Sequence, residues 1–386
     1  MQLTKLPFDT DNMLLGLKPW IECESPTYDA AAVNRMMDLA CYDLGAMGAT
    51  VERIPGRFGL GDSVRAKLPH PNLGQPGILI SGHLDTVHPI GTLQQLPFKH
   101  EDGKCWGPGI QDMKGGNYLT LEAIRQLQKA EITTPLPVSV LFTPDEEIGT
   151  PSTRELIEAT AKQNKYVLVP EPATSDGGVV WGRYAIARYD LKTTGVPAHA
   201  GIDPRLGQSA VKEMARRLIQ IEDMTTDDCT FSVSCIRGGE WVNCVASECT
   251  AQALSMARTQ QDLDKGVQSM LALNDTESDI KFTVSRGVTR PVWEPDDGTR
   301  ALYEHAESLA KDLGFKLPTQ MAGGGSDANF TGAMGIPTLD SLGVQGAGLH
   351  TLNEHIEVAS LATRGQLMAD LLTTLCLLYT SPSPRD

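Results

Sequence analysis

Residues 76–87 read PGILISGHLDTV. Their apolar run, 76–81 (PGILIS), is followed closely by His83 and Asp85. The run is short and bounded by proline and glycine, which is typical of a buried β-strand. In an extended chain, side chains two residues apart point to the same side, so the carboxylate of Asp85 can hold the second ring nitrogen of His83. Metal-bound histidines usually have such a partner. The segment therefore predicts a buried strand with a candidate metal ligand at its end.

The segments that follow alternate between helix and strand. Residues 116–130 have the spacing of an amphipathic helix, and residues 152–161 that of a short one. Residues 138–143 (VSVLFT) and 166–169 are further apolar runs that we expect to be buried strands. This β-α-β-α order predicts an α/β fold with a mixed or parallel sheet covered by helices.

From residue 184 the pattern changes, because residues 184–193 alternate like a half-exposed strand. The elements expected next are helix 209–221, strands 230–236 and 248–257, helix 261–273 and strand 280–286. The larger pattern then resumes with helix 298–313, strand 338–341 and helix 360–375. We therefore predict a discontinuous catalytic domain (1–183 and 291–375), with a mixed central sheet flanked by helices, and an inserted two-layer α+β domain (184–290).

The composition limits the classes of protein to which this chain can belong. Its 386 residues favour two domains, and 33 Lys+Arg against 48 Asp+Glu give a net charge of −15. That charge argues against a partner that is a nucleic acid or an anionic membrane, since either needs a basic face. No stretch approaches about 18 consecutive apolar residues, and residues 1–20 lack the apolar block of a signal peptide. We therefore expect a cytoplasmic protein.

No chemistry is expected from the cysteines or from the C-terminal tail. The eight cysteines include no C-x-x-C pair, which favours reduced thiols over a disulfide framework. Residues 376–386 (CLLYTSPSPRD) differ abruptly from the helical pattern before them and match the translation of a common sequencing-library adapter. We expect this tail to be non-native and exclude it from the fold.

Two segments place acids where a metal centre could form. Residues 107–116 (GPGIQDMKGG) put Asp112 just before a helix, and their glycines allow close approach of the backbone. Residues 143–149 (TPDEEIG) put three adjacent acids at the end of a buried strand. Like charges packed there repel, and their burial is costly unless cations or protons compensate. Adjacent strand positions face opposite ways, so Glu146 and Glu147 can take different roles, one as a ligand and one as a base.

Glu171, in the sequence VPEP, and His350, in GAGLHT, complete the set of candidate ligands. Two histidines and three carboxylates suit a pair of borderline cations such as zinc, with one carboxylate bridging them. Each segment alone is a weak signal, and their joint occurrence after buried strands is what favours a metal centre. Competing motifs are absent: there is no H-E-x-x-H, residues 323–326 lack the lysine spacing of a P-loop, and no Rossmann fingerprint follows a strand.

Seven motifs together resemble a family of dinuclear-zinc metallopeptidases. In order they are SGHLDTV, GPGIQDMKGGN, TPDEEIGT, PEPA, GVPAHAG, GGGSDAN and GLHTLNE, and they span nearly the whole chain before the tail. The family includes carboxypeptidase G, aminoacylase, acetylornithine deacetylase and succinyl-diaminopimelate desuccinylase. Within it, GPGIQDMKGGN followed by LFTPDEEIGTPSTRELI is most similar to the carboxypeptidase G-like glutamate carboxypeptidases.

The resemblance implies two zinc ions in each subunit, with cobalt or manganese compatible with the same ligand types. The ligands that it implies are His83, Asp112, Glu147, Glu171 and His350. Asp112 would bridge both ions and precede a cis peptide bond. Glu146 would be the general base, and Asp85 would orient His83.

The resemblance also implies that the inserted domain is a lid that forms a homodimer. His199 would reach into the partner's site and stabilise the oxyanion, together with Asn243. A substrate carboxylate needs a fixed cation, for which arginine is suited by its two-point contacts. Arg258 fits the family's position for that role, and Arg183 and Arg290 at the domain junctions are further candidates.

We therefore expect a zinc-dependent hydrolase that releases a C-terminal amino acid from a peptide or N-acyl amino acid. A hydroxide that bridges the metal ions would attack the amide carbonyl, after Glu146 has taken its proton. An alternative is an N-acyl-amino-acid deacylase. The two enzymes perform the same chemistry and differ only in whether the acyl side or the amino-acid side of the amide is recognised. A third possibility is an inactive binding protein on the same scaffold, whose signature would be lost ligands.

Overall fold

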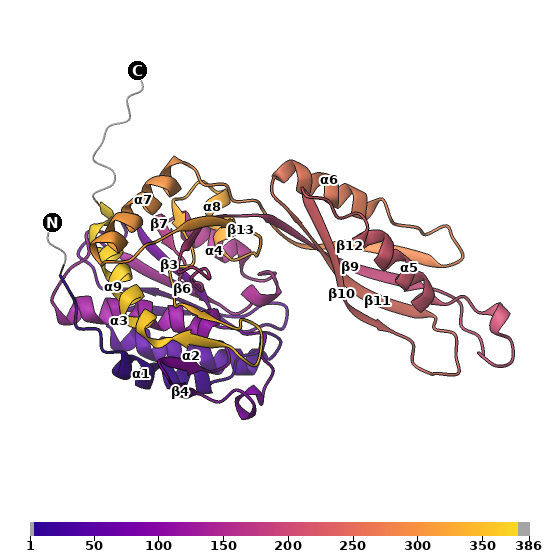
Figure 1. The fold of residues 1–386 in the computed structure, drawn as a ribbon, viewed down its shortest axis with the longest axis horizontal. Coiled ribbons are helices and arrows are strands. Elements are labelled where there is room, and N and C mark those ends of the chain that lie inside the picture. Colours follow the sequence, from indigo (N-terminus) through magenta and orange to yellow (C-terminus); the bar gives the residue numbers. More distant parts are fainter. Residues whose placement is uncertain (1–3, 377–386) are drawn as a thin grey trace, which may run out of the picture. The chain divides into compact units, whose positions relative to one another are not determined.

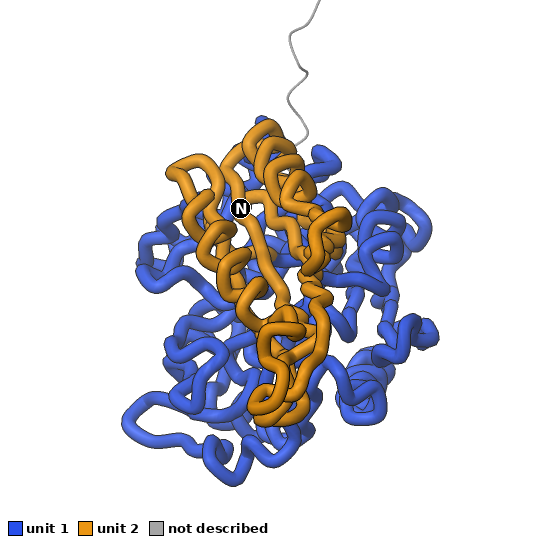
Figure 2. The backbone as a smooth tube through the Cα atoms, turned by 90° about the vertical axis from the view of Figure 1, so that its right-hand side faces the viewer, with its two compact units in different colours: residues 1–182, 294–321, 326–386 blue, residues 183–293, 322–325 orange. Residues whose placement is uncertain are grey.

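Figure 1 shows the computed structural model of the chain, which describes residues 4–376. It contains two compact units, drawn in different colours in Figure 2. Unit 1 consists of residues 4–182, 294–321 and 326–376, and unit 2 of residues 183–293 and 322–325. Apart from Cys376, the tail predicted to be non-native lies outside the described residues. None of the helices in the described part has the length and apolar character needed to cross a lipid bilayer.

Unit 1 is built on a mixed sheet with the strand order β1-β2-β6-β3-β7-β14. These strands are β1 (Thr50–Ile54), β2 (Ser63–Lys67), β3 (Gly77–His83), β6 (Val138–Thr143), β7 (Asn164–Leu168) and β14 (Thr338–Leu339). β3 pairs in parallel with β6 and with β7, and β14 is parallel to β7, whereas β2 is antiparallel to β1 and to β6. Every residue of β3 is buried, so this strand is covered on both faces, as its continuous apolar run predicts.

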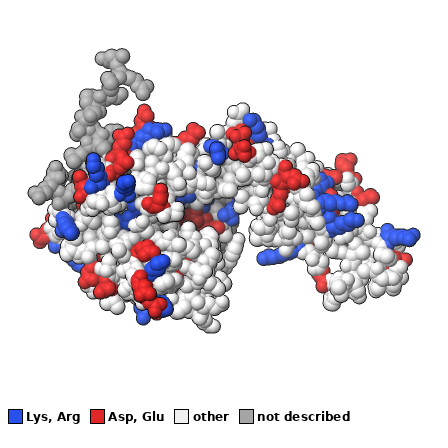
Figure 3. Space-filling model, in the orientation of Figure 1, with Lys and Arg blue, Asp and Glu red and all other residues white. Residues whose placement is uncertain are grey.

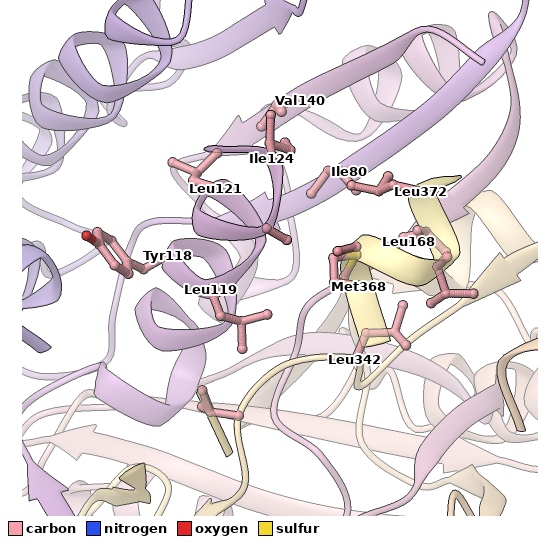
Figure 4. Close-up of a cluster of buried hydrophobic side chains, with 14 of the residues drawn as sticks. Ile80, Tyr118, Leu119, Leu121, Ile124, Val140, Leu168, Leu342, Met368 and Leu372 are labelled. Atoms are coloured by element: carbon pink, nitrogen blue, oxygen red, sulfur yellow. The ribbon is translucent and has the colours of Figure 1, made fainter. Parts of the chain in front are cut away.

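Helices cover the sheet of unit 1. They are α1 (Thr10–Glu22), α2 (Ala30–Ala46), α3 (Gly115–Lys129), α4 (Arg154–Ala161), α7 (Asp297–Asp312), α8 (Ala328–Ala333) and α9 (Val358–Thr374), with the short turn η1 (Thr92–Gln94). α3 packs against α1 and α9, while α4 packs against β3, β7 and α8. Figure 4 shows part of the resulting core, in which apolar side chains of α3 and α9 lie beside Ile80, Val140 and Leu168 of the sheet.

Shorter elements bring distant parts of unit 1 together. One small sheet has the order β15-β16-β5-β4, formed by β15 (Gly346–Ala347), β16 (His355–Glu357), β5 (Lys104–Trp106) and β4 (Lys99–Glu101). β13 (Thr319–Ala322) pairs with β8 (Val179–Arg183). The turns η2 (Ile110–Lys114) and η3 (Glu146–Ile148) follow β5 and β6. Because β16 pairs with β5, the chain after His350 runs beside the chain before Asp112.

Unit 2 is a two-layer structure with the antiparallel strand order β10-β11-β9-β12. Its elements are β9 (Ala185–Thr194), η4 (Pro204–Leu206), α5 (Ala210–Glu222), β10 (Cys229–Gly238), β11 (Glu248–Ala257), α6 (Gln260–Leu271) and β12 (Lys281–Arg290). Buried residues alternate with more exposed ones along β9, and α5 and α6 both pack against this strand. Within the unit, one face of the sheet is therefore covered by helices, which gives the unit an apolar core of its own.

The predicted fold class is confirmed, since a mixed central sheet is flanked by helices. Strands β6 and β11 have the bounds that the sequence predicts, and the predicted strand 338–341 is shorter. Neither β1 and β2 nor the strands of the small sheets were expected. These strands are short or partly exposed, so they leave little periodicity in the sequence.

On the face drawn in Figure 3, charged side chains of both signs are mixed. Charged side chains of unit 1 also form pairs: Arg53 contacts Asp38 and Asp62 at 3.0 Å each, and Arg65 contacts Glu52 at 2.6 Å. Exposed pairs of this kind each contribute at most about 1 kcal/mol.

Candidate metal centre

The candidate site lies where parallel strands of unit 1 end. β3 ends at His83, which is paired in register with Thr143, the last residue of β6. The acids of the 143–150 turn therefore follow directly beside His83. β7 runs parallel to β3 on the other side, and Glu171 comes just after its end. Carboxyl ends of parallel strands meet at one edge of a sheet, which is where such folds commonly place their sites.

Asp112 lies between two imidazole rings. Its Oδ1 atom is 3.1 Å from Nε2 of His83, and its Oδ2 atom is 3.2 Å from Nε2 of His350. Nε2 of His350 is also 3.3 Å from Oε2 of Glu147, and Nε2 of His83 is 3.7 Å from Oε1 of Glu171. The structure therefore brings together all five side chains that the sequence suggested as ligands, with one carboxylate between two groups of donors.

Glu146 approaches the same cluster. Ligand atoms of His83, Glu146 and Glu171 lie within 4.8 Å of one another, as do those of His83, Asp112 and Glu147. The two neighbouring glutamates thus lie in different groups around His83. His83 is 1% exposed, whereas the side chain of His350 is 52% exposed, so the cluster is buried on one side and reaches solvent on the other.

Burial and crowding perturb the acids of this cluster. Burial raises the pKa of Glu147 to about 8, and the negative charge of Asp112 acts in the same direction. Burial, again with the charge of Asp112, raises the pKa of Glu171 well above its usual range. Without a cation, these two carboxyl groups therefore hold protons that a free carboxylate would release.

The pKa values of the histidines are raised as well, by hydrogen bonds to the carboxylates. Hydrogen bonds to Asp112 and Glu147 raise the pKa of His350 to about 10. Although burial disfavours the charged ring, hydrogen bonds to Asp112 and Asp85 raise the pKa of His83 as well. The cluster thus compensates its buried negative charge with protons, which is the role that cations would take. Imidazole nitrogens and carboxylate oxygens at this spacing suit one or two divalent cations such as zinc.

Asp85 connects His83 to the turn that carries Glu146 and Glu147. Its carboxylate accepts hydrogen bonds from the main-chain N–H groups of Glu146 at 3.2 Å and Glu147 at 3.3 Å, and from the hydroxyl of Thr27 at 2.7 Å. Nδ1 of His83 lies 3.0 Å from the main-chain oxygen of Asp85 and 3.3 Å from its Oδ1. Asp85 therefore contacts the second nitrogen of His83, and it also anchors the turn that carries the adjacent glutamates.

The remaining acid of the triplet, Asp145, points away from the cluster and stabilises the turn that follows. Its carboxylate accepts hydrogen bonds from the main-chain N–H and the hydroxyl of Ser152, both at 2.7 Å, and from the hydroxyl of Thr153. Asp327, in the glycine-rich loop 323–329, accepts hydrogen bonds from the hydroxyls of Thr143, at 3.1 Å, and of Thr150. Sequence reasoning did not assign these roles, although serines and threonines after the triplet were a usable signal.

The remaining candidates belong to unit 2. Nδ1 of His199 accepts hydrogen bonds from the N–H groups of Gly201 at 3.1 Å and Ile202 at 3.2 Å. The N–H of Ala200 donates to the main-chain oxygen of Asn243 at 2.9 Å, so the loops of His199 and Asn243 run side by side. In the neutral ring the proton of His199 must then lie on Nε2, because Nδ1 is an acceptor.

The candidate arginines of unit 2 differ in exposure. Arg258 is exposed, and its guanidinium lies 5.7 Å from the centre of the Tyr184 ring. Arg183 is buried, and its Nη1 donates to the main-chain oxygen of Gly324 at 2.7 Å. Arg290 is buried as well. Arg258 is therefore the most solvent-accessible of the three side chains.

Residues 79–374 match the sequence profile of peptidase family M20/M25/M40. The chain belongs to this family. Its relatives include carboxypeptidase G2 of Pseudomonas sp. (strain RS-16), which is 30% identical over 370 residues that cover 93% of this chain and 88% of the relative. The succinyl-diaminopimelate desuccinylase of Burkholderia multivorans (strain ATCC 17616 / 249) is 29% identical over 310 residues, covering 74% of this chain and 80% of that one.

A solved member of the same fold is aminopeptidase PepT from Bacillus cereus ATCC 10987, with a TM-score of 0.70 at 22% identity, covering 97% of this chain and 100% of that one. This likeness concerns the fold alone. The predicted resemblance and the predicted hydrolase class are confirmed by the M20 matches. The chain is an M20 hydrolase, and its cluster of histidines and carboxylates agrees with the metal dependence of that family.

Proposed function

We propose that this M20 hydrolase cleaves an amide bond to release a C-terminal amino acid from a peptide or an N-acyl amino acid, as a glutamate carboxypeptidase does. The observation that carries the proposal is the position of Asp112 between His83 and His350, at 3.1 and 3.2 Å, with Glu147 and Glu171 beside the two rings. The carboxypeptidase assignment is supported by the 93% of the chain that aligns with carboxypeptidase G2.

His83, Asp112, Glu147, Glu171 and His350 would hold two zinc ions in each subunit, and the same donors accept cobalt or manganese. Such cations would polarise the scissile carbonyl and make a water molecule acidic enough to attack it. The donor set is suited to them because its buried carboxylates otherwise need protons.

Glu146 would act as the general base and then as the acid. Its main-chain N–H is bonded to Asp85, and its carboxylate lies with His83 and Glu171. From this place the carboxylate can take a proton from the attacking water and return it to the leaving nitrogen, which general acid–base catalysis requires. Asp85 would keep both Glu146 and His83 in position for that exchange.

Unit 2 would supply the contacts to the substrate. His199 has its Nδ1 occupied by two main-chain amides, which leaves an Nε2–H able to donate to the oxyanion, and Asn243 lies on the adjoining loop. Arg258 would bind the substrate carboxylate. In this proposal the enzyme is a cytoplasmic homodimer in which unit 2 is the lid and His199 completes the partner's site, so light scattering should give twice the monomer mass.

A second candidate is an N-acyl-amino-acid deacylase, which is favoured by the 29% identity to a succinyl-diaminopimelate desuccinylase. A panel of dipeptides and N-acyl amino acids with free or amidated C-termini separates the two, with products identified by mass spectrometry. The carboxypeptidase assignment predicts cleavage across varied acyl groups, a preference for one C-terminal residue and a need for its free carboxylate. Cleavage of acetyl or succinyl substrates alone would support the deacylase, and no cleavage by the zinc-loaded protein would contradict both.

A further inference from the structure

The segments that carry His83, Asp112 and His350 converge on one carboxylate, that of Glu354. This residue lies in the loop between β15 and β16, shortly after His350, and its side chain is buried with 1% of its surface exposed. It is not among the residues to which the proposed chemistry gives a role. A buried carboxylate is costly unless its oxygens receive hydrogen bonds, so its partners show what it does.

Both carboxylate oxygens of Glu354 contact the turn that carries Asp112. Oε1 accepts hydrogen bonds from the main-chain N–H groups of Gln111 at 2.8 Å and Asp112 at 3.1 Å. Oε2 accepts one from the N–H of Gly109 at 3.1 Å. Amides at the start of a helical turn have no partner within the turn, and a carboxylate is the strongest side-chain acceptor for them. Glu354 therefore fixes the backbone of Asp112 directly.

The fourth partner of Glu354 belongs to the segment after His83. Nε2 of His88 lies 2.6 Å from Oε2 of Glu354, and the His88 side chain is buried as well. This contact ties the end of the segment 83–88 to the loop of His350. The carboxylate thus contacts the segments that hold His83 and Asp112, and Glu354 itself belongs to the loop that holds His350.

The backbone of Glu354 strengthens the same connection. Its main-chain oxygen accepts a hydrogen bond from Gly107 at 3.4 Å, and its N–H donates to the main-chain oxygen of Thr351 at 3.3 Å. His350 itself has φ of 60°, a left-handed conformation that is unfavourable for a residue with a side chain. Such a conformation persists only where the surrounding structure holds it. Glu354 is the first buried residue after His350 in this loop.

We propose that Glu354 is a positioning residue of the metal centre: its carboxylate holds the turn of Asp112 and the loop of His350 in the geometry that retains the metal ions. The inference rests on the proposed function, because it takes Asp112 and His350 to bind a divalent cation. Glu354 contacts neither the substrate nor the cation in this proposal. It acts through the residues that do.

The test is the rate at which the full-length, zinc-loaded protein releases zinc to a chromophoric chelator. In Glu354→Gln, an amide nitrogen replaces one acceptor oxygen and faces N–H donors, so zinc release should be about 10- to 100-fold faster. For a substrate cleaved by the wild type, kcat should fall while KM changes little, and excess zinc should restore part of kcat. A role in overall stability alone would not produce this selective loss of metal.

Glu24→Gln is a matched control. Glu24 also accepts main-chain N–H hydrogen bonds, from Gly91 at 2.8 Å and Leu93 at 2.9 Å, but these belong to a loop that carries no candidate ligand. This variant should release zinc at the wild-type rate. His88→Phe keeps an aromatic ring, slightly larger than imidazole, and removes one donor, so it should accelerate zinc release as Glu354→Gln does, by a smaller factor.

Each outcome bears on the proposal. Zinc release at the wild-type rate from Glu354→Gln would overturn it, and if that variant does not fold, an unchanged rate in His88→Phe would overturn it instead. A wild-type protein that binds zinc but cleaves no amide contradicts the proposed function alone, since the release rates still decide the role of Glu354. A wild-type protein that binds no divalent cation would overturn both.

Discussion

Oδ1 of Asp85 accepts a hydrogen bond from the main-chain N–H of Glu146 at 3.2 Å. The same side chain lies 3.3 Å from Nδ1 of His83. A single carboxylate thus links the proposed base to a proposed metal ligand. Because Asp85 is fully buried, its hydrogen-bond donors come from the protein, namely the hydroxyl of Thr27 and the N–H groups of Glu146 and Glu147.

Replacing this carboxylate should slow the reaction without unfolding the protein. In Asp85→Asn, one acceptor oxygen becomes an N–H₂ group. In the Oδ2 position this group faces the N–H of Glu147, and in the Oδ1 position it faces the N–H of Glu146 and Nδ1 of His83, so the turn loses an anchor in either orientation. We expect kcat to fall about 10- to 100-fold. Asp62→Asn is a control, because Asp62 accepts the N–H of Gly56 at 2.8 Å outside the site. Equal kinetic losses in the two variants would contradict the role of Asp85.

The assignment of Glu146 as base is tested by Glu146→Gln. The amide cannot take a proton from water, so turnover should fall about 10²- to 10⁴-fold. The zinc content, measured by mass spectrometry of the metal, should stay at the wild-type value, because the five proposed ligands are intact. Loss of zinc in parallel with activity would show instead that Glu146 is a ligand.

Removal of the metal should destabilise unit 1 as well as abolish activity. Chelation removes the cations that would compensate the buried carboxyl groups of Glu147 and Glu171, which must then take up protons instead, and the folded state loses the binding free energy of the metal. We expect a lower thermal midpoint for the metal-free protein and recovery of both stability and activity when zinc is restored. A cation present at 100 times its dissociation constant stabilises the folded state by about 2.7 kcal/mol. A thermal midpoint that does not change would argue against a metal site in this cluster.

Asp370 gives a pH dependence that is independent of the site. Burial in α9 raises its pKa from 3.8 to about 6, although Gln366 donates a hydrogen bond to its Oδ1 at 2.8 Å. The folded state therefore holds this proton to a higher pH than the unfolded state, and stability is lost as the pH rises from 3.8 to about 6. At pH 7 the loss is at most about 3 kcal/mol, because solvent screens part of the effect.

Asp370→Asn should abolish that loss, since an amide does not titrate and its oxygen can still accept from Gln366. Urea unfolding at pH 4 and pH 7 measures the difference between variant and wild type at each pH. We expect the variant to gain stability relative to the wild type at pH 7, and to gain much less at pH 4. An equal difference at both values would show that the carboxyl group is not perturbed in the folded protein.

Much of the architecture could be predicted because the buried strands leave strong local signals. β3 and β6 are continuous apolar runs, and β9 alternates between buried and exposed residues. β1 and β16, in contrast, are short or partly exposed, so neither hydrophobic period is visible in them. Their positions depend on pairing with distant strands, which no local pattern records.

The same distinction applies to the site. The ends of the apolar strands predicted that His83 and the acid triplet 145–147 belong to the site. They did not predict which of the three acids points away from the metal cluster. Asp145 turns toward Ser152 and Thr153, a choice made by packing and not by sequence spacing. Glu354 could not be found in this way at all, because the donors that surround it lie more than 240 residues earlier in the chain.

His350 follows the whole of unit 2 in the chain, whereas His83, Asp112, Glu147 and Glu171 precede it. During synthesis on the ribosome, four of the five proposed ligands therefore emerge long before the last. Until His350 has been synthesised, the nascent chain has three of the proposed carboxylate ligands and only one of the two histidines. Metal acquisition is then expected late in biosynthesis, and a fully loaded protein reports that the chain has been made and folded at least as far as His350.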